Sequence, residues 1–226
     1  TQATLNLARQ AIANGCRRLI FISTIQVNGE QTYGQAFSES DRPSPANDYA
    51  LSKWEAEQQL WALAAETELE ITVLRIPLVY GPGVKGNLQR LLSLIHKGWP
   101  LPLGAINNHR SLLGLENLFS AIAACLKQDQ AAGRTYLVSD GEDVSTTELI
   151  RKISDGMSRR PVLLPVPVFI LGLLFGLIGR RAEYHRLCGD LAVNSQAIRD
   201  ELNWLPAMTV DEGLRQMGAW YEQQIA

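Results

Sequence analysis

Hydrophobic and polar positions follow two patterns along the chain, and these predict helices and buried strands in turn. Residues 3–14 and 47–66 carry apolar side chains at helical spacing. Continuous apolar runs over 17–24 and 70–81 are typical of strands that are buried on both faces, and the second run ends at a Gly-Pro-Gly turn, residues 81–83. Short strands that alternate with long helices predict a parallel sheet with right-handed crossovers, and therefore an α/β fold.

The second half of the chain continues this alternation. A third buried strand is expected over 134–140, and a segment rich in Pro, Gly and Asn, residues 99–109, is expected to include a short strand. Ser145 or Thr146 is placed to cap the helix that follows, with Glu148 as the capping-box partner. Further helices are predicted over 86–97, 115–128, 145–158 and 210–224.

The most apolar segment, residues 166–178, is far shorter than the roughly 20 residues that a membrane-spanning helix needs. Our main interpretation is a buried or lid helix that packs on the domain. The alternative is a helix that contacts a membrane surface, which Arg180 and Arg181 at its end favour.

Composition narrows the possible partners. The 226 residues include 21 basic and 23 acidic side chains, so the net charge is only -2 and we expect no nucleic-acid partner. Widely separated cysteines outside any CxxC pair are typical of reduced thiols in a cytoplasm, and the scattered histidines predict no metal site. The residues concerned are Cys16, Cys125, Cys188, His96, His109 and His185.

Candidate chemistry lies where a predicted strand ends and where a predicted helix begins. Ser23 and Thr24 fall at the carboxyl end of a parallel strand, the edge where open α/β sheets bind their ligands. Tyr49 and Lys53 are four residues apart on the following helix, so their side chains share one face. A nearby ammonium is expected to lower the pKa of a tyrosine and so make it a usable base.

These features, in this order, resemble the extended short-chain dehydrogenase/reductase family, and in particular its NAD-dependent epimerase/dehydratase branch that acts on nucleotide sugars. The resemblance runs over essentially the whole chain. A lone Tyr-x-x-x-Lys is a weak signal, but here it has four ordered companions. The stretches that carry the likeness are SPANDYALSK, LRIPLVYGPG, HRSLLGLENL and VNSQAIRDELNWLP with the later VDEGL.

The resemblance implies a catalytic group of Thr24, Tyr49 and Lys53, with NAD or NADP as cofactor. Tyr49 would take the proton from a sugar hydroxyl while hydride leaves the same carbon, and Thr24 would hold that oxygen by a hydrogen bond. Ser23, Tyr49, Lys53 and Pro77 are expected next to the cofactor. The alternative is that Thr24 only caps the strand end and Lys53 is solvated.

The resemblance also implies a substrate site for a nucleotide sugar, with UDP as the first choice of nucleotide. Arg110 matches an arginine that contacts the diphosphate, a role that suits its fork of donors, unless it is a surface cation. Asn87 matches a position that binds phosphate or sugar, and a helix cap is an equal alternative. Arg75 lies near the nicotinamide region by resemblance, or is structural.

Departures from the family pattern narrow the reaction. The 4,6-dehydratases carry Asp and Glu after the catalytic Thr, whereas Ile25 and Gln26 follow Thr24 here, so we expect no dehydratase activity. UDP-galactose 4-epimerases carry an Asn at the position of Leu78. Its absence favours a 4-keto reductase, or an epimerase acting on a deoxy or N-acetylated sugar of bacterial surface polysaccharide pathways.

The chain starts without the GxxGxxG turn that binds the cofactor pyrophosphate in this family. We interpret it as a fragment of a larger enzyme, a homodimer when complete; the alternatives are a cofactor half supplied elsewhere, or an inactive remnant that still binds a nucleotide sugar. The expected fold is a partial Rossmann-like sheet without its leading strands, followed by a smaller α/β portion. Residues 1–83 would carry the catalytic group and 84–226 mainly the substrate site, with 115–140 returning to the sheet.

Overall fold

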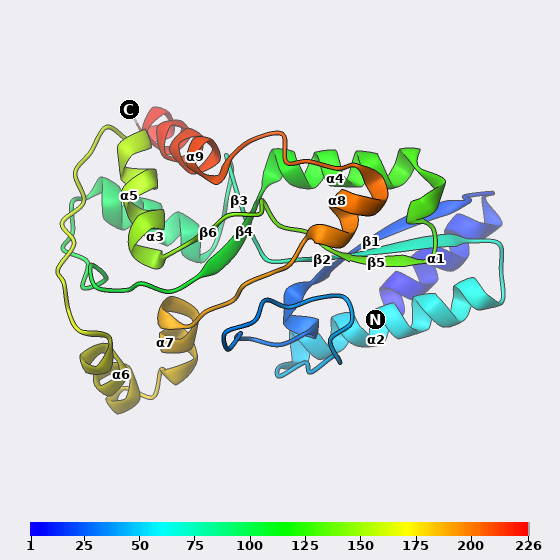
Figure 1. Ribbon diagram of the computed structural model, residues 1–226, viewed down its shortest axis with the longest axis horizontal. Helices are drawn as coiled ribbons and strands as arrows, with labels where there is room; N and C mark the ends of the chain where they lie inside the picture. Colours follow the sequence, from blue (N-terminus) through cyan, green and yellow to red (C-terminus); the bar gives the residue numbers. More distant parts are fainter. Residues whose placement is uncertain (226) are drawn as a thin grey trace.

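A three-stranded parallel sheet forms the first part of the fold, as the apolar runs predict. The computed structural model describes residues 1–225 and places the strands in the order β1–β2–β5 (Figure 1). Ser23 on β1 lies opposite Arg75 on β2, and Arg75 lies opposite Leu137 on β5. The strands are β1 (Arg18–Thr24), β2 (Glu70–Ile76) and β5 (Arg134–Leu137). The predicted α/β class with a parallel sheet is therefore confirmed.

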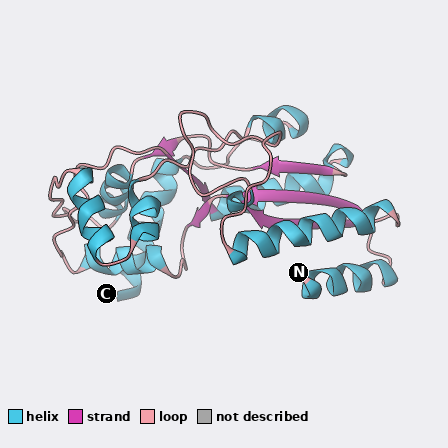
Figure 2. Ribbon diagram, turned by 90° about the horizontal axis from the view of Figure 1, so that it is seen from below, coloured by secondary structure: helices cyan, strands magenta, loops and turns pink. Residues whose placement is uncertain are grey.

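Helices cover both faces of this sheet (Figures 1 and 2). Successive strand residues point to opposite faces, so Val73 packs under the first helix pair with Ala8 and Leu60, while Leu74 packs under the second pair with Leu118. Both faces of β2 are therefore buried under helices. The first pair is α1 (Gln2–Ala13) and α2 (Asp48–Ala65), and the second is α4 (Leu115–Lys127) and α8 (Gln196–Leu202).

A second, smaller sheet and its helices form the other end of the molecule (Figure 2). Its strands are in the order β3–β4–β6, with β3 parallel and β6 antiparallel to β4. The core between them and the helices includes Tyr80, Leu92, Leu112, Ile150 and Leu214. The elements are β3 (Leu78–Tyr80), α3 (Asn87–His96), β4 (Arg110–Gly114), β6 (Asp143–Val144), α5 (Thr146–Gly156) and α9 (Val210–Ile225).

Two strand predictions need correction. The single strand expected over 70–81 is two strands in two sheets, because Pro77, between β2 and β3, has no N–H to continue a ladder. The segment 99–109 holds only an isolated bridge between Leu101 and Leu163, and the strand lies immediately after it, as β4. Alternation is too short there to locate a five-residue strand from sequence.

The helix predictions hold, including the cap of α5. Ser145 accepts a hydrogen bond from the backbone of Glu148, whose carboxylate accepts one from the backbone N–H of Ser145. Short connecting helices complete the described chain: η1 (Ile25–Val27), η2 (Asp129–Ala131), α6 (Val168–Leu177) and α7 (Arg181–Cys188).

Helices α5 and α9 approach each other unusually closely, through glycines. A Cβ atom on Gly156 would overlap the carbonyl oxygen of Arg215, and one on Gly218 would overlap the carbonyl oxygen of Ile153. Neighbouring core residues Leu214 and Met217 are fully buried against the second sheet. The contact therefore depends on a side chain of hydrogen alone at both positions.

The apolar helix α6 packs on the core of the second sheet but is not buried, so of the two forms that we expected for residues 166–178, a buried helix and a lid helix, the buried one is wrong. Only Leu171 is buried, while Val168 and Phe175 pack partly against the core of the second sheet. Its other large apolar side chains face outward. Among the described residues, no helix is both long enough and apolar enough to cross a membrane.

Candidate active site

Helix α2 presents a row of polar side chains to the carboxyl end of β1. Asn47 caps the helix by accepting a hydrogen bond from the backbone N–H of Ala50 at 2.9 Å. Tyr49, Lys53 and Glu57 then follow at intervals of four residues, so they share one face. The phenol of Tyr49 is 55% exposed at the start of this row.

Lys53 is held against the strand rather than solvated. Its Nζ donates to the carbonyl oxygen of Ile22 at 2.9 Å and lies 4.8 Å from the centre of the Phe21 ring. Burial lowers the pKa of Lys53, and the Glu57 carboxylate opposes that change. Because an ammonium has three donors, two remain for a ligand. This geometry contradicts the alternative of a solvated lysine.

Thr24 is the last residue of β1 and begins the short helix η1. Its hydroxyl oxygen accepts a hydrogen bond from the backbone N–H of Gln26 at 3.3 Å. The hydroxyl proton has no acceptor within the described residues, so it can be donated to a substrate oxygen. Thr24 therefore caps the turn and still keeps its donor.

A buried ion pair lies directly behind these groups. Glu57 accepts hydrogen bonds from Arg75 Nε at 3.2 Å and Nη2 at 2.6 Å, and from the Ser23 hydroxyl at 2.5 Å. Arg75 also donates to Asn28 Oδ1 at 3.0 Å and stacks 5.5 Å from the Trp54 ring. The pair joins α2, β1, β2 and the loop after η1. Arg75 is thus structural in this arrangement, one of the two roles that the sequence left open.

A second link fixes the start of α2 to η1. Asn47 Nδ2 donates to Gln26 Oε1 at 3.0 Å and to Glu30 Oε1 at 2.6 Å. Ile25 is buried with Leu137 and faces the core. Neither Ile25 nor Gln26 has a side chain that can act as an acid or a base here, so the structure gives these positions supporting roles.

Arg110, at the first position of β4, is largely enclosed. Its Nη1 donates to the carbonyl oxygen of Gly189 at 3.0 Å, and burial lowers the pKa of Arg110 while Asp190 raises it. Only one of its five N–H donors is used within the described residues. Arg110 is therefore not a free surface cation, and its fork is available to a ligand.

The segment after α7 connects β4, which begins at Arg110, with the loop that follows η1. Leu191 forms backbone hydrogen bonds with His109 and Ser111, on either side of Arg110, and packs against Ile25, the residue after Thr24. The N–H of Thr32, in the loop after η1, donates to the carbonyl oxygen of Asp190 at 3.0 Å. Residues 190–191 thus contact both the start of β4 and the loop after η1, two stretches that are far apart in sequence.

The remaining predicted residues differ in their surroundings. Pro77 is buried at the chain crossing between the two sheets, and Leu78 beside it is half exposed. Asn87 is exposed at the first position of α3, and Gly86 holds the cap position, so the structure gives no support to the cap alternative. The Ser23 hydroxyl is engaged by Glu57. The ligand contacts of these residues stay predictions.

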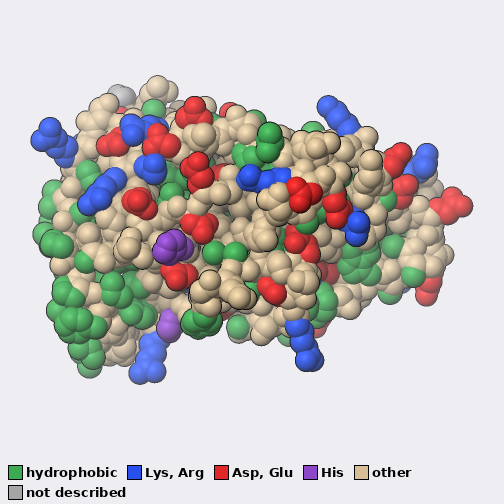
Figure 3. All heavy atoms as spheres, viewed as in Figure 1, with side chains coloured by type: hydrophobic (Ala, Val, Ile, Leu, Met, Phe, Trp, Pro, Cys, Tyr) green, Lys and Arg blue, Asp and Glu red, His purple; other side chains and the backbone are tan. Residues whose placement is uncertain are grey.

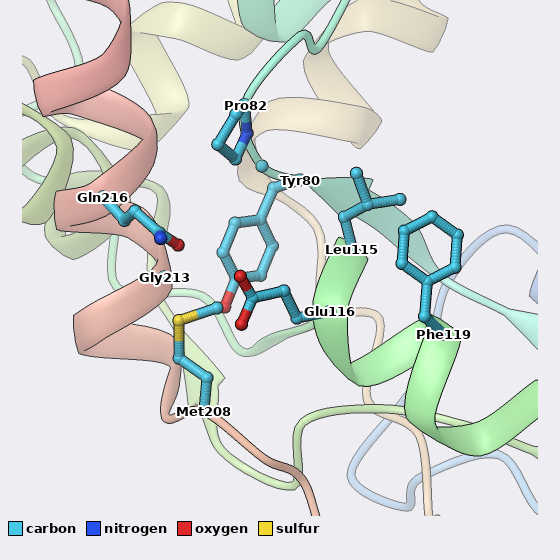
Figure 4. A pocket seen from close by; sticks show the side chains of 9 residues that line it. Tyr80, Pro82, Leu115, Glu116, Phe119, Met208, Gly213 and Gln216 are labelled. Atoms are coloured by element: carbon cyan, nitrogen blue, oxygen red, sulfur yellow. The ribbon is translucent and has the colours of Figure 1, made fainter. Parts of the chain in front are cut away.

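A cleft of about 310 Å³ lies elsewhere, between the end of β3, the start of α4 and helix α9 (Figure 4). Glu116 is its one charged lining side chain among the described residues, and its walls are mostly apolar. Neither Tyr49, Lys53 nor Arg110 lines it. We therefore place the candidate chemistry at the α2–β1 edge rather than in this cleft.

The sequence analysis missed three residues that support the site: Glu57, Asn28 and Asn47. One signal was present, because Glu57 continues the Tyr49–Lys53 row and a charge on the buried face of a helix normally has a partner. Asn28 gave no such signal, since its role depends on where β2 brings Arg75.

Comparison with known proteins identifies the family to which the chain belongs. The family model described as "NAD dependent epimerase/dehydratase family" matches residues 1–139. The chain is 44% identical over 218 residues to a UDP-glucose 4-epimerase of Vibrio cholerae, with 96% of this chain and 66% of that protein covered. It is 29% identical over 175 residues to the N-acetyl-alpha-D-glucosaminyl-diphospho-ditrans,octacis-undecaprenol 4-epimerase of Escherichia coli O157:H7, with 76% and 52% covered.

The fold agrees with a solved structure of similar architecture. The crystal structure of UDP-glucuronic acid 4-epimerase from Bacillus cereus in complex with NAD matches with a TM-score of 0.79 at 18% identity, covering 100% of this chain and 68% of that one. The chain thus spans just under two thirds of the Vibrio cholerae protein and about half of the Escherichia coli protein. On this evidence, and as its motifs predicted, the chain belongs to the NAD-dependent epimerase/dehydratase family.

Proposed function

We propose that the protein is an NAD(P)-dependent enzyme that inverts or reduces a sugar carbon, C4 in the first place, of a nucleotide sugar. The observation that carries this proposal is the row on α2, where the partly buried Lys53 is bound to the strand that ends at Thr24 and the exposed phenol of Tyr49 has no partner within the described residues. The 44% identical relative named as a 4-epimerase supports epimerisation over reduction.

Each residue has a distinct task in this proposal. The Tyr49 oxygen takes the proton from the sugar hydroxyl as that carbon loses hydride, and it returns the proton when hydride comes back. The Thr24 hydroxyl donates to the same sugar oxygen and fixes its position. The ammonium of Lys53 stabilises negative charge on Tyr49. Glu57 holds α2 against β2 through Arg75 and against β1 through Ser23, so these tasks can meet at one oxygen.

The residues present fit the nicotinamide end of the cofactor. Lys53 keeps two donors for ribose hydroxyls, and Tyr49 is open to the same side. When bound, the nicotinamide would accept and return the hydride. Ser23 and Pro77 remain proposed neighbours of this group.

The substrate would be held through its diphosphate by Arg110, with Asn87 as a further proposed contact. We expect Arg110→Ala to weaken nucleotide-sugar binding by about 10- to 100-fold, because a charge-assisted contact contributes roughly 1.5–3 kcal/mol. Binding of the cofactor should change little. Isothermal titration of the whole protein with UDP-glucose and with NAD separates the two effects.

Two further variants make this measurement specific. Arg110→Lys keeps the charge but loses the fork and should recover only part of the affinity. Arg9→Ala removes an exposed cation on α1 and should leave both affinities unchanged. Equal nucleotide-sugar affinity in the wild-type and Arg110→Ala proteins would assign Arg110 to holding Gly189 alone.

The reaction itself is tested with the whole protein and UDP-glucose or UDP-galactose. An epimerase interconverts the two without net oxidation of cofactor, whereas a reductase consumes one reduced cofactor for each product. Binding of the nucleotide sugar without either outcome, across a panel of UDP-sugars that includes N-acetylated ones, would favour a non-catalytic binding protein.

One observation favours a second candidate substrate, a sugar joined through diphosphate to a polyprenol. The exposed apolar helix α6 is followed directly by α7. Arg110 donates a hydrogen bond to the carbonyl oxygen of Gly189, the residue after α7. The 29% identical relative is named for an undecaprenol-linked sugar. Product analysis with the lipid-linked sugar in detergent, beside the UDP-sugar, decides between the two.

The proposal also covers how the enzyme assembles and where in the cell it acts. We propose a homodimer for the complete enzyme, to be tested by light scattering. The three cysteines are unpaired in the structure, and we propose a cytoplasmic site of action, where UDP-sugars and NAD(P) would both be supplied.

A further inference from the structure

Helix α6 has an apolar face that no described part of the chain covers. Figure 3 shows hydrophobic side chains gathered at the lower left, over α6 as placed in Figure 1. The large side chains on this face are between 36% and 84% exposed. They are Phe169, Ile170, Leu173, Leu174, Leu177 and Ile178. A contiguous apolar patch of this kind marks a contact surface.

The helix is nevertheless firmly attached by its opposite side. Leu171 is buried in the core of the second sheet, and Phe175 lies 6.4 Å from the Tyr184 ring of α7. Gly172 packs against the same tyrosine. The exposed face is therefore presented by an anchored helix, which is apolar all round.

Charge next to the patch identifies the kind of partner. Residues 161–179 contain no charged side chain, and the following stretch supplies exposed Arg180, Arg181 and Arg186 against a single acidic residue, Glu183. None of these four forms an ion pair with another described residue. Three free guanidinium groups beside an apolar face are complementary to phospholipid headgroups with negative charge.

Length decides how such a helix would meet a bilayer. Ten residues of α6 extend about 15 Å, roughly half the hydrocarbon thickness. The helix would therefore lie in the plane of the surface, with its apolar side chains below the headgroups and the arginines among them. A stable protein interface requires roughly 20–30 residues on each side, so six side chains make a poor match for a second copy of the chain.

We propose that α6 docks the protein onto an anionic phospholipid bilayer, with Arg180, Arg181 and Arg186 at the headgroups. On the proposed function, this orientation brings the diphosphate site at Arg110 close to the membrane, since α7 links the two. The docking itself is independent of catalysis and has its own readout.

Vesicle flotation of the whole protein tests the docking directly. The protein is mixed with vesicles of phosphatidylcholine alone, or with phosphatidylglycerol added, and the fraction that floats is measured over a range of salt. We expect flotation with the anionic vesicles, a weaker response with the neutral ones, and a decrease as salt rises.

Paired variants separate the apolar and the charged contributions. Leu173→Ser with Leu177→Ser should lower the vesicle partition coefficient at least about tenfold. Arg180→Gln with Arg181→Gln should lower it by roughly tenfold on anionic vesicles and little on neutral ones. Leu205→Ser, an exposed leucine far from α6 in the fold, is the matched control and should float like the wild type. All of these side chains are exposed, so the thermal midpoint should not change.

Two results would overturn the proposal. One is a wild-type protein that stays at the bottom of the gradient with anionic vesicles at low salt. The other is a concentration-dependent dimer that Leu173→Ser with Leu177→Ser abolishes while vesicle binding is unaffected, because this would assign the face to a second copy of the chain.

Discussion

Tyr49→Phe is expected to lower turnover of the whole enzyme by about 10²-fold or more, because it removes the proton-transfer group and almost no contact area. The phenol is exposed, and its hydroxyl has no partner among the described residues. Stability and nucleotide-sugar affinity should therefore stay near wild-type values. Steady-state kinetics with UDP-glucose, together with calorimetric titration, measures both quantities.

A second tyrosine supplies the control for this experiment. Tyr33 is more exposed than Tyr49, and its hydroxyl donates to Gln31 at 3.0 Å rather than to any residue of the row on α2. Tyr33→Phe should leave turnover unchanged. Near wild-type rates for Tyr49→Phe as well would remove Tyr49 from the proposed mechanism.

Glu57→Gln should lower the free energy of unfolding by about 3–5 kcal/mol, the usual cost of breaking a buried ion pair on one side. Arg75 would be left charged and buried without a charged partner, because the Gln amide oxygen and Asn28 Oδ1 are both neutral acceptors. The hydrogen bond from the Ser23 hydroxyl would also weaken, because a neutral amide oxygen accepts less strongly than a carboxylate. Urea unfolding of the whole protein, followed by fluorescence and by circular dichroism, measures the loss.

Two companion proteins test the physical reason. Glu55→Gln changes an exposed carboxylate on the same helix, which accepts one side-chain hydrogen bond within the described chain, from Thr1, and should cost well under about 1 kcal/mol. Glu57→Leu combined with Arg75→Met removes both charges and should be more stable than Glu57→Gln, because no unpaired charge remains. If Glu57→Gln unfolds at the wild-type urea concentration, the pair is not a stability determinant.

The sequence predicted those features that depend on local spacing. Apolar periodicity located α1, α2 and α4 and the three parallel strands of the first sheet, although it did not locate α8, and the order of motifs identified the family. Tyr49 and Lys53 share a helix face because four residues make about one turn. A proline at position 77 indicates a break in the strand. That the chain then leaves one sheet for another depends on where β4 lies.

Features that depend on distant partners could not be predicted in this way. The apolar run of 166–178 reads like a buried helix, yet only Leu171 finds a place in the core, because α3 and α5 already fill it. Likewise, Glu57 is adjacent to Lys53 on the helix, but its partner Arg75 comes from another strand. Pairing of this kind follows from the assembled fold and not from the period of a segment.

The glycine contact between α5 and α9 limits which mutations of the gene are tolerated. Any single-base change in a glycine codon that alters the amino acid adds at least a Cβ atom or ends the chain. At Gly156 and Gly218 that atom would meet a carbonyl oxygen of the facing helix, so substitutions there separate two helices rather than trim one side chain. These codons are far from Tyr49 in sequence, and they nevertheless limit which inherited variants of the protein can still fold.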